Sequence, residues 1–270
     1  MGYPSDLLSS RAVVKPGMYA IIPPEGRVFN VIPGIEGCRM TILCTPKMGA
    51  GFVQHIGTAL PGGGTTVPYG ASGQIETFIY VLDGEGSLTV TVGERTEVMP
   101  QGGYAYAPAG VGISFRNETD KPLRFLLYKQ RYIPHPDPAM QPYAVFGNTN
   151  DIEERIYDNM ENVFVRDLLP VDERFDMNMH ILSFAPGGCH PFVETHVQEH
   201  GAYLYEGPKT SSGWARTASS AATVWASPAF PTSTPRIATA TRRFDAGGPP
   251  RFRRRAAFPT TPTSYNGALS

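Results

Sequence analysis

The stretch 76-ETFIYVLDGEGSLTVTVG-93 has the pattern that predicts the fold: runs of apolar and β-branched residues separated by a glycine-containing turn. We interpret it as a β-hairpin that turns at Asp83-Gly84-Glu85-Gly86. With 29 Gly and 26 Pro, the chain has enough turn residues to separate many short strands. The sequence therefore predicts an all-β fold, and only residues 151–164 have a weak helical pattern. Similar runs lie on both sides of the first, namely RVFNVIPG, MTILCTP, AGFVQHIGTAL, YAYAPAGVGISFRN and PLRFLLYKQRYI.

The strand pattern restarts in the second half of the chain. The string 199-EHGAYLYEG-207 repeats 76-ETFIYVLDG-84, because both have Glu, Tyr and Gly at the same spacing. The string 178-NMHILSFAPGG-188 likewise resembles 40-MTILCTPKMGAG-51. Two all-β units in tandem are therefore expected, each a small barrel or jelly roll.

Unit boundaries follow from this repeat and from a proline-containing linker at 134–144. We assign residues 1–145 to the first unit and residues 146–210 to the first half of the second unit. The remaining residues, 211–270, no longer follow the repeat. They hold eight Arg, no Lys, one acid (Asp245) and few Leu, Ile or Val.

A segment of this composition has too little apolar surface to offset the entropy of ordering. We therefore expect residues 211–270 to be largely irregular and the second barrel to be incomplete. One interpretation is a natural basic tail. The one we favour is translation in a wrong frame, because Arg without Lys, together with Ala and Pro, is typical of misread GC-rich codons.

Metal-binding side chains are concentrated in 194-ETHVQEH-200. Glu194 and His196 lie two residues apart, so on a strand they point to the same face. His200 follows across a short bend if a new strand starts at Gly201. A carboxylate and two imidazoles suit a divalent Mn, Fe, Zn or Ni ion, and three protein ligands leave positions open for substrate or water.

Two other interpretations of this string remain. On a helix, His196 and His200 would also lie one turn apart, although the flanking PGGCHP and GAYLYEG favour strands. These residues can also be ordinary polar side chains at a strand edge. In the first unit the equivalent positions are Ala71, Gly73 and Thr77, so we expect that unit to bind no metal in this way and to serve packing and subunit contact.

The other polar candidates have simpler interpretations. Glu199 and Gln198 are expected to face solvent or to support the ligands, His190 to be a distal ligand or a pocket residue, and His180 to lie in the core or a pocket wall. We expect structural roles for His55 and His135. Cys38, Cys44 and Cys189 fit free thiols in a reducing cytoplasm, because they are scattered and odd in number.

Several function classes are not supported by the sequence. It has no apolar run of 18 residues, so we expect no membrane span. Its first residues lack a basic and then apolar leader, so we expect no secretion signal. The cluster 251-RFRRR-255 is the one candidate for nucleic-acid contact, and because it lies in the aberrant segment we predict no nucleic-acid partner.

The string ETHVQEHGAYLYEG resembles the metal motif of the cupins, with Glu in place of the usual first histidine and His in place of the usual glutamate. Over about residues 8–207 the sequence resembles the (S)-ureidoglycine aminohydrolase family, bicupins of purine (allantoin) catabolism. The strings that carry this resemblance are 175-FDMNMHILSFAPGG-188, ETHVQEHGAY, 76-ETFIYVLDGEG-86, 102-GGYAYAPAG-110 and 126-LLYKQRYIP-134.

The resemblance implies tandem cupin jelly-roll barrels and a manganese-dependent hydrolase, in the form of a homo-oligomer. The small-molecule substrate would be (S)-ureidoglycine, and the products ammonia and (S)-ureidoglycolate. It implies Glu194, His196 and His200 as ligands of Mn²⁺, with Glu194 also able to carry a proton as a catalytic residue. The family's later Gln ligand and its pocket Tyr and Lys have no counterpart here, since residues 211–270 contain neither Gln nor Lys and Ser211 stands where the Tyr is expected.

Two alternatives to this function follow from the same residues. One is a different cupin reaction on the same metal, such as an oxygenase or sugar isomerase. The other is a non-catalytic metal- or ligand-binding bicupin, which the missing C-terminal residues favour.

Overall fold

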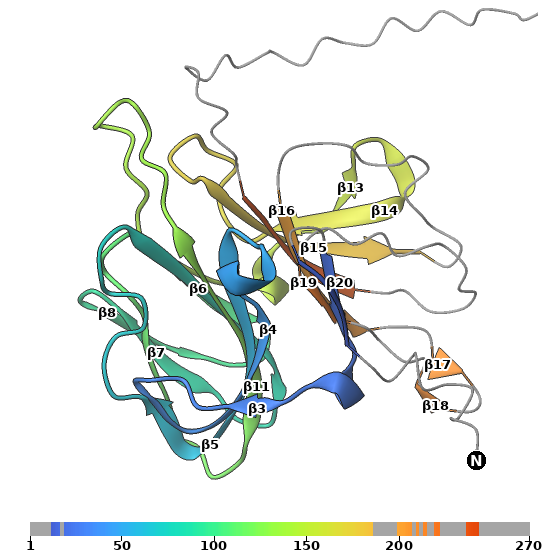
Figure 1. The fold of residues 1–270 in the computed structure, drawn as a ribbon. Helices are drawn as coiled ribbons and strands as arrows, with labels where there is room; N and C mark the ends of the chain where they lie inside the picture. Colours follow the sequence, from blue (N-terminus) through green and yellow to red (C-terminus); the bar gives the residue numbers. More distant parts are fainter. Residues whose placement is uncertain are drawn as a thin grey trace, which may run out of the picture.

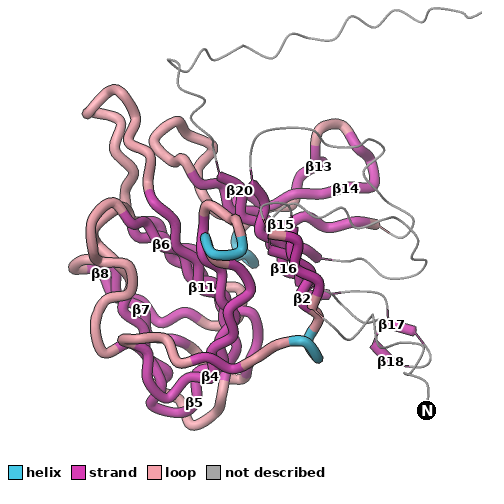
Figure 2. Tube along the Cα trace, in the orientation of Figure 1, coloured by secondary structure: helices cyan, strands magenta, loops and turns pink. Residues whose placement is uncertain are grey.

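The structure, a computed structural model, describes residues 12–16, 19–185, 199–206, 209–210, 213–214, 219–221 and 236–242. These residues form mostly β-strands, which confirms the predicted all-β fold (Figures 1 and 2). No helix in this part of the chain is long and apolar enough to cross a membrane. Its helical turns are η1 (Pro24–Gly26), η2 (Pro46–Met48) and η3 (Thr149–Asp151).

The first sheet has ten strands and curls into a nearly closed barrel (Figure 1). Its strand order is β12-β9-β6-β11-β5-β10-β7-β8, with β4 beside β5 and β3 beside β4. Apolar side chains from alternate positions fill the barrel interior, among them Ile79, Val81 and Leu127. The strands are β3 (Phe29–Asn30), β4 (Ile35–Cys44), β5 (Phe52–Thr65), β6 (Ile75–Gly84), β7 (Leu88–Val92), β8 (Arg95–Met99), β9 (Gly103–Ala107), β10 (Ser114–Asn117), β11 (Leu123–Arg131) and β12 (Val145–Asn148).

The predicted hairpin at residues 76–93 is wrong in its pairing. β6 lies between β9 and β11, whereas β7 pairs with β8 and β10. The turn after β6 therefore carries the chain to the other layer of the jelly roll, as in a Greek key. Gly84 is required there, because its φ is 135° and a Cβ would lie 2.5 Å from the Cβ of Leu123.

The second sheet has eight strands in the order β1-β2-β19-β16-β20-β15-β14-β13, and β17 and β18 pair separately. It lies beside the first barrel (Figure 1). The strands are β1 (Val13–Lys15), β2 (Tyr19–Ile22), β13 (Arg155–Tyr157), β14 (Met160–Asp167), β15 (Met177–Phe184), β16 (Glu199–Glu206), β17 (Lys209–Thr210), β18 (Gly213–Trp214), β19 (Ser219–Ala221) and β20 (Arg236–Arg242).

The weak helical pattern at residues 151–164 is a hairpin instead. Tyr157 at the end of β13 pairs with Met160 at the start of β14, so the turn has two residues. Those residues, Asp158 and Asn159, have φ of 48° and 62°. Asp and Asn tolerate this left-handed conformation, which two-residue hairpins require. The dipeptide was therefore a stronger signal than the acidic start of the segment.

The expectation of a largely irregular segment at 211–270 is wrong for β20. This strand lies between β15 and β16 and pairs with both. Its sequence, RIATATR, has β-branched residues at alternate positions, Ile237, Thr239 and Thr241. The composition of the whole segment hides this local alternation. Within 211–270 the structure also describes β18 and β19, and the rest lies outside the described residues.

The two sheets have the same register around their central strands. β20 occupies in the second sheet the place that β11 has in the first, between the equivalents of β5 and β6. β14 pairs with β15 as β4 pairs with β5, and β19 pairs with β16 as β9 pairs with β6. In the first sheet, Leu127 of β11 pairs with His55 of β5 and with Ile79 of β6. In the second sheet, Thr239 of β20 pairs in the same way with His180 of β15 and with Ala202 of β16.

This register corrects one of the predicted sequence matches. β15 is equivalent to β5, so 179-MHILSFAPGG-188 corresponds to 54-QHIGTALPGG-63 and not to residues 40–51. The two sheets also exchange strands. β2 pairs with β19 in the second sheet, while β12, which follows the linker, pairs with β9 in the first. The unit boundary near residue 145 stays a prediction.

A shared apolar core joins the two sheets. Buried side chains from the outer face of the barrel pack with buried side chains of β15, β16 and the loop before β15. Phe52 stacks on Tyr128 with ring centroids 4.9 Å apart, and Tyr106 meets Phe175 edge-on at 5.3 Å. The second sheet contributes Phe175, Met177, Met179, Ile181 and Tyr203 to this core.

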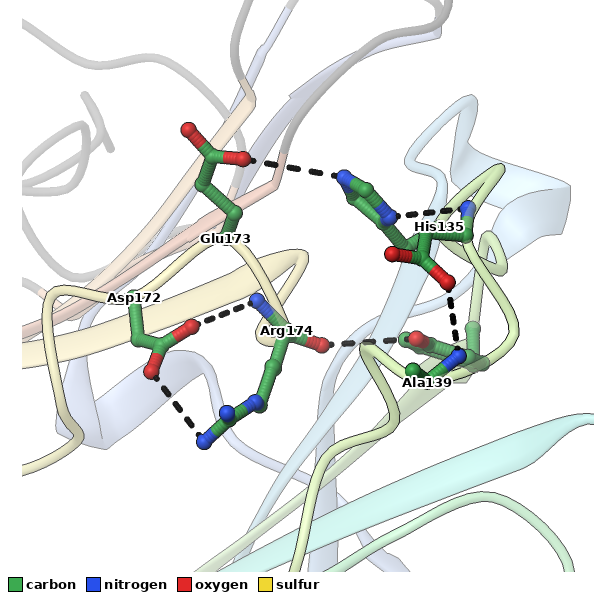
Figure 3. Close-up of polar contacts among 7 residues, drawn as sticks. His135, Ala139, Asp172, Glu173 and Arg174 are labelled. Atoms are coloured by element: carbon green, nitrogen blue, oxygen red, sulfur yellow. Dashed lines mark hydrogen bonds and ion pairs between the residues drawn. The ribbon is translucent and has the colours of Figure 1, made fainter.

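Polar contacts hold the linker against the loop that precedes β15 (Figure 3). The Nε2 atom of His135 lies 3.7 Å from the Glu173 carboxylate, and the Tyr132 hydroxyl donates to the Arg174 carbonyl oxygen at 3.3 Å. Asp172 accepts a hydrogen bond from the Arg174 N–H at 3.0 Å and so closes its own loop. His135 and the neighbouring Tyr132 thus tie the start of the linker to this loop.

Candidate metal centre

The structure describes one of the three predicted metal ligands. His200 is the second residue of β16, is half-buried and pairs through its backbone with Thr241 of β20. Glu194 and His196 lie outside the described residues, so the metal site and the catalytic role of Glu194 stay predictions. In the part of the chain that the structure describes, no group of three His, Cys, Asp or Glu side chains is placed to hold a metal.

His180 lies on the same face of the second sheet as His200. Along β15, Met179 and Ile181 pack into the core shared with the barrel, so His180 between them points away from it. Along β16, Tyr203 packs into that core, so His200, three residues earlier, points away as well. Two imidazoles on either side of β20 thus lie on the face of the second sheet opposite the shared core, the face that would line a second barrel. Imidazole is a suitable ligand for first-row divalent ions.

The first sheet offers different side chains at the equivalent positions. Thr77 pairs with Lys129 in the first sheet as His200 pairs with Thr241 in the second. Thr77 is fully buried and supplies a hydroxyl where His200 supplies an imidazole. This part of the first barrel therefore has no imidazole or carboxylate at the third ligand position.

Glu199, next to His200, makes a contact that the sequence did not predict. Its Oε2 atom accepts a hydrogen bond from the backbone N–H of Gly51 in the first unit, at 2.5 Å. It therefore reaches across to the barrel instead of facing solvent. The same carboxylate and, above all, burial raise the pKa of the nearby Cys44 thiol to about 12.

A second carboxylate, Glu76, lies fully buried between the sheets. The Tyr106 hydroxyl donates to it at 2.5 Å, and the Gln130 amide donates to it at 2.6 Å. The same amide lies 3.3 Å from the Asp176 carboxylate, which also accepts from the Ile133 N–H at 2.7 Å. Burial, followed by the hydrogen bond and the charge of Asp176, raises the pKa of Glu76 well above its usual range. Glu76 therefore keeps its proton to a higher pH than an ordinary glutamate does.

These two inter-sheet contacts are equivalent by register. Glu76 corresponds to Glu199, and Gly51 corresponds to Asp176, so each unit sends a carboxylate to the same position of the other. The sequence alone did not predict this cluster, because Glu76 stands at the start of an apolar strand and its partner, Asp176, lies a hundred residues later. An acid inside a predicted buried strand was the available signal.

The remaining candidates lie apart from this centre or outside the described residues. Cys38 and Cys44 are free thiols, as expected, and burial raises the pKa of Cys38 to about 11. Such thiols are unreactive at neutral pH. Cys189, His190 and Gln198 lie outside the described residues.

Comparison with known proteins places the chain in a family. A cupin-domain family model matches residues 58–128. The (S)-ureidoglycine aminohydrolase of Escherichia coli K12 is 46% identical over 206 residues, covering 76% of this chain and 77% of that protein. The Arabidopsis thaliana (S)-ureidoglycine aminohydrolase is 26% identical over 192 residues, covering 70% and 60%. The crystal structure of the E. coli protein Ylba has a TM-score of 0.71 at 36% identity, covering 91% of this chain and 99% of that one. This chain belongs to the (S)-ureidoglycine aminohydrolase family.

Proposed function

We propose that this chain hydrolyses (S)-ureidoglycine to (S)-ureidoglycolate and ammonia, as part of purine (allantoin) catabolism. The observation that carries the proposal is the 46% identity to the E. coli enzyme over 77% of its length. In this reaction the bond from the substrate's central carbon to its amine nitrogen breaks, and a bond from the same carbon to a water oxygen forms. The amine leaves as ammonia, with a proton from the attacking water.

The reaction belongs in the second unit, on the face of its sheet that carries His180 and His200. Glu194, His196 and His200 would hold a divalent first-row ion, Mn²⁺ by family resemblance. When bound, this ion supplies the positive charge that orients the substrate's carboxylate and amine. His200, the one of these ligands that the structure describes, supplies an imidazole, which suits such an ion. Glu194 would also carry the proton that the leaving amine needs, and His180 would line the substrate space.

A metal-binding bicupin without hydrolase activity is the second candidate, and the register of β20 favours it. Thr241 stands opposite His200 where the first unit has Lys129 opposite Thr77. The residue at this position of β20 is therefore neither a lysine nor an amide. The wrong-frame hypothesis for residues 211–270 explains that loss, and sequencing the coding DNA around codons 207–212 tests it.

The cellular setting is part of the proposal. We place the chain in the cytoplasm as a homo-oligomer that acts on a small molecule. Two free thiols, the half-buried Cys38 and the buried Cys44, agree with a reducing compartment. The molecular mass in solution, measured by light scattering, tests the oligomer.

An ammonia-release assay separates the two functions. The purified chain, stripped of metal and then reloaded with Mn²⁺, is given (S)-ureidoglycine, and bound manganese is measured in parallel. We expect ammonia release only with Mn²⁺, its loss in His200→Ala and its retention in His135→Ala, a control in the linker. Manganese bound at full occupancy without ammonia release would support the non-catalytic bicupin. Metal-independent release that survives His200→Ala would contradict the site.

A further inference from the structure

The interior of the first barrel contains a polar group where the second unit has its predicted metal ligands. Its members are His55 on β5, Thr77 on β6, Lys129 on β11 and Tyr69 in the segment between β5 and β6. The three strands are neighbours in the sheet, in the order β5-β11-β6. Lys129 and Thr77 are direct cross-strand partners, a relation that places their Cβ atoms about 5 Å apart.

Alternation along the strands shows that these side chains point inward. Ile79 and Val81 follow Thr77 on the same face of β6, and both belong to the barrel core. Leu127 precedes Lys129 on the same face of β11 and belongs to that core as well. The remaining strand face, with residues such as Tyr128, packs toward the second sheet.

The group is partly connected by contacts of its own. The Tyr69 hydroxyl and the Nδ1 atom of His55 are 3.2 Å apart, and the Lys129 ammonium lies 4.5 Å from the centre of the Tyr69 ring. The Thr77 hydroxyl is fully buried and has no hydrogen-bond partner among the described residues. A buried hydroxyl left in this state is destabilising unless another group satisfies it.

The charge of the group is +1. Burial, and then the Lys129 charge, lower the pKa of His55 to about 4, so the imidazole is neutral at pH 7. Burial lowers the pKa of Lys129, and among the described residues no carboxylate lies close enough to form an ion pair with it. The half-buried Lys129 ammonium thus has no counter-ion among the described residues, and its cross-strand partner Thr77 has an unpaired hydroxyl. One small anion could bind to both groups.

We propose that Lys129 and Thr77, supported by Tyr69 and His55, bind a small monocarboxylate inside the first barrel. One carboxylate oxygen accepts from the Lys129 ammonium and the other from the Thr77 hydroxyl. The Tyr69 ring holds the ammonium from another side, and its hydroxyl is kept in place by His55. A metal cation is disfavoured here by the ammonium, so the first unit provides its own fixed positive charge where the second would bind an ion.

Acetate is the test probe, with acetamide as its neutral counterpart. Saturation-transfer NMR on the full chain gives the acetate dissociation constant at constant ionic strength. We expect binding of acetate but not of acetamide. We expect Lys129→Met to weaken acetate at least about tenfold, because a charge-assisted hydrogen bond is lost. The control Lys47→Met, at an exposed lysine of η2, should leave binding unchanged.

A second pair of variants tests the hydroxyl independently of the charge. Thr77→Val should weaken acetate severalfold, while Thr77→Ser should bind as the wild type does. If Lys129→Met fails to fold, the comparison of Thr77→Val with Thr77→Ser still tests whether acetate binds here. The proposal is overturned if acetamide or chloride competes as well as acetate, or if neither Lys129→Met nor Thr77→Val changes the constant. None of these readouts depends on hydrolase activity.

Discussion

Glu76 and Asp176 come from different units and lie beside the same donor, the amide nitrogen of Gln130, at 2.6 and 3.3 Å. Because Glu76 is fully buried, a second negative charge next to Asp176 would be strongly unfavourable. The pair therefore needs the Glu76 proton, and the contact between the sheets is linked to pH.

Replacing Glu76 by Gln should remove that linkage. A carboxyl group whose pKa is raised in the folded state keeps its proton while the unfolded chain loses it. The wild type therefore loses stability as the pH rises above about 4.3, the usual pKa of Glu, until it passes the raised pKa. Glu76→Gln should gain about 1.4 kcal/mol per pH unit relative to the wild type within that window. Urea unfolding at several pH values measures it, and parallel stability curves would refute the assignment.

His55 should produce the opposite dependence on pH. Its pKa is lowered from 6.5 to about 4 in the folded state, so its contribution is complete above pH 6.5 and is lost as the pH falls through 4. Against His55→Gln, the wild type should lose about 3 kcal/mol over this range. The comparison uses denaturant unfolding of both proteins at pH 7 and pH 4. The assignment fails if the difference between the two proteins is the same at both values.

Gly57 on β5 allows the side chain of Phe125 to reach the barrel core. A Cβ at this position would lie 2.4 Å from the Phe125 Cζ atom and 2.7 Å from the Met40 Sδ atom. Gly57→Ala should therefore destabilise the protein by about 1–3 kcal/mol, measured by chemical denaturation. In the background of Phe125→Leu, which shortens the obstructing side chain, the same change should be less destabilising. Equal effects in both backgrounds would show that the ring is not the obstacle.

Truncation tests whether β20 is a real part of the second sheet. A chain ending after residue 243 retains β20, whereas one ending after residue 235 leaves β15 and β16 with unpaired edges. We expect the shorter chain to aggregate and the longer one to keep the amide protection of Met177–Phe184 in hydrogen exchange. Equal protection in the two chains would mean that β20 contributes nothing.

Local sequence pattern predicted the strands but not their partners. The run of apolar and β-branched residues in 76-ETFIYVLDG-84 identifies a strand, and its match at 199–207 identifies the second copy. The turn after β6 contains Asp83-Gly84, a dipeptide typical of hairpins, yet β6 and β7 do not pair, because the strand partners are set by the packing of the whole barrel. Asp158-Asn159 does form a two-residue hairpin turn, within an acidic, helix-like segment.

Composition and spacing were less informative about the site. The averaged composition of 211–270 concealed the short alternation of β20. His-Ile and Pro-Gly-Gly occur at the same spacing after residue 54 and after residue 179, and this repeat aligns His180 with His55. The predicted match of residues 178–188 to residues 40–51 rested on a weaker similarity. The Glu76 cluster depends on two sheets meeting, which no local pattern describes. Of the three predicted ligands the structure describes only His200, on β16, so the ligand set stays a prediction.

The order in which the strands of the second sheet are synthesised is unfavourable for their pairing during translation. β15 and β16 emerge from the ribosome before β20, and β2 must wait for β19 although it is made almost at the beginning. At roughly 5–20 residues per second, the N-terminal strand spends on the order of ten seconds or more without its partner. During that time Ala20 and Ile22, buried in the finished protein, are open to other nascent chains. Chaperone supply and temperature during expression should therefore influence the yield of this protein more than changes to the surface of its finished barrel.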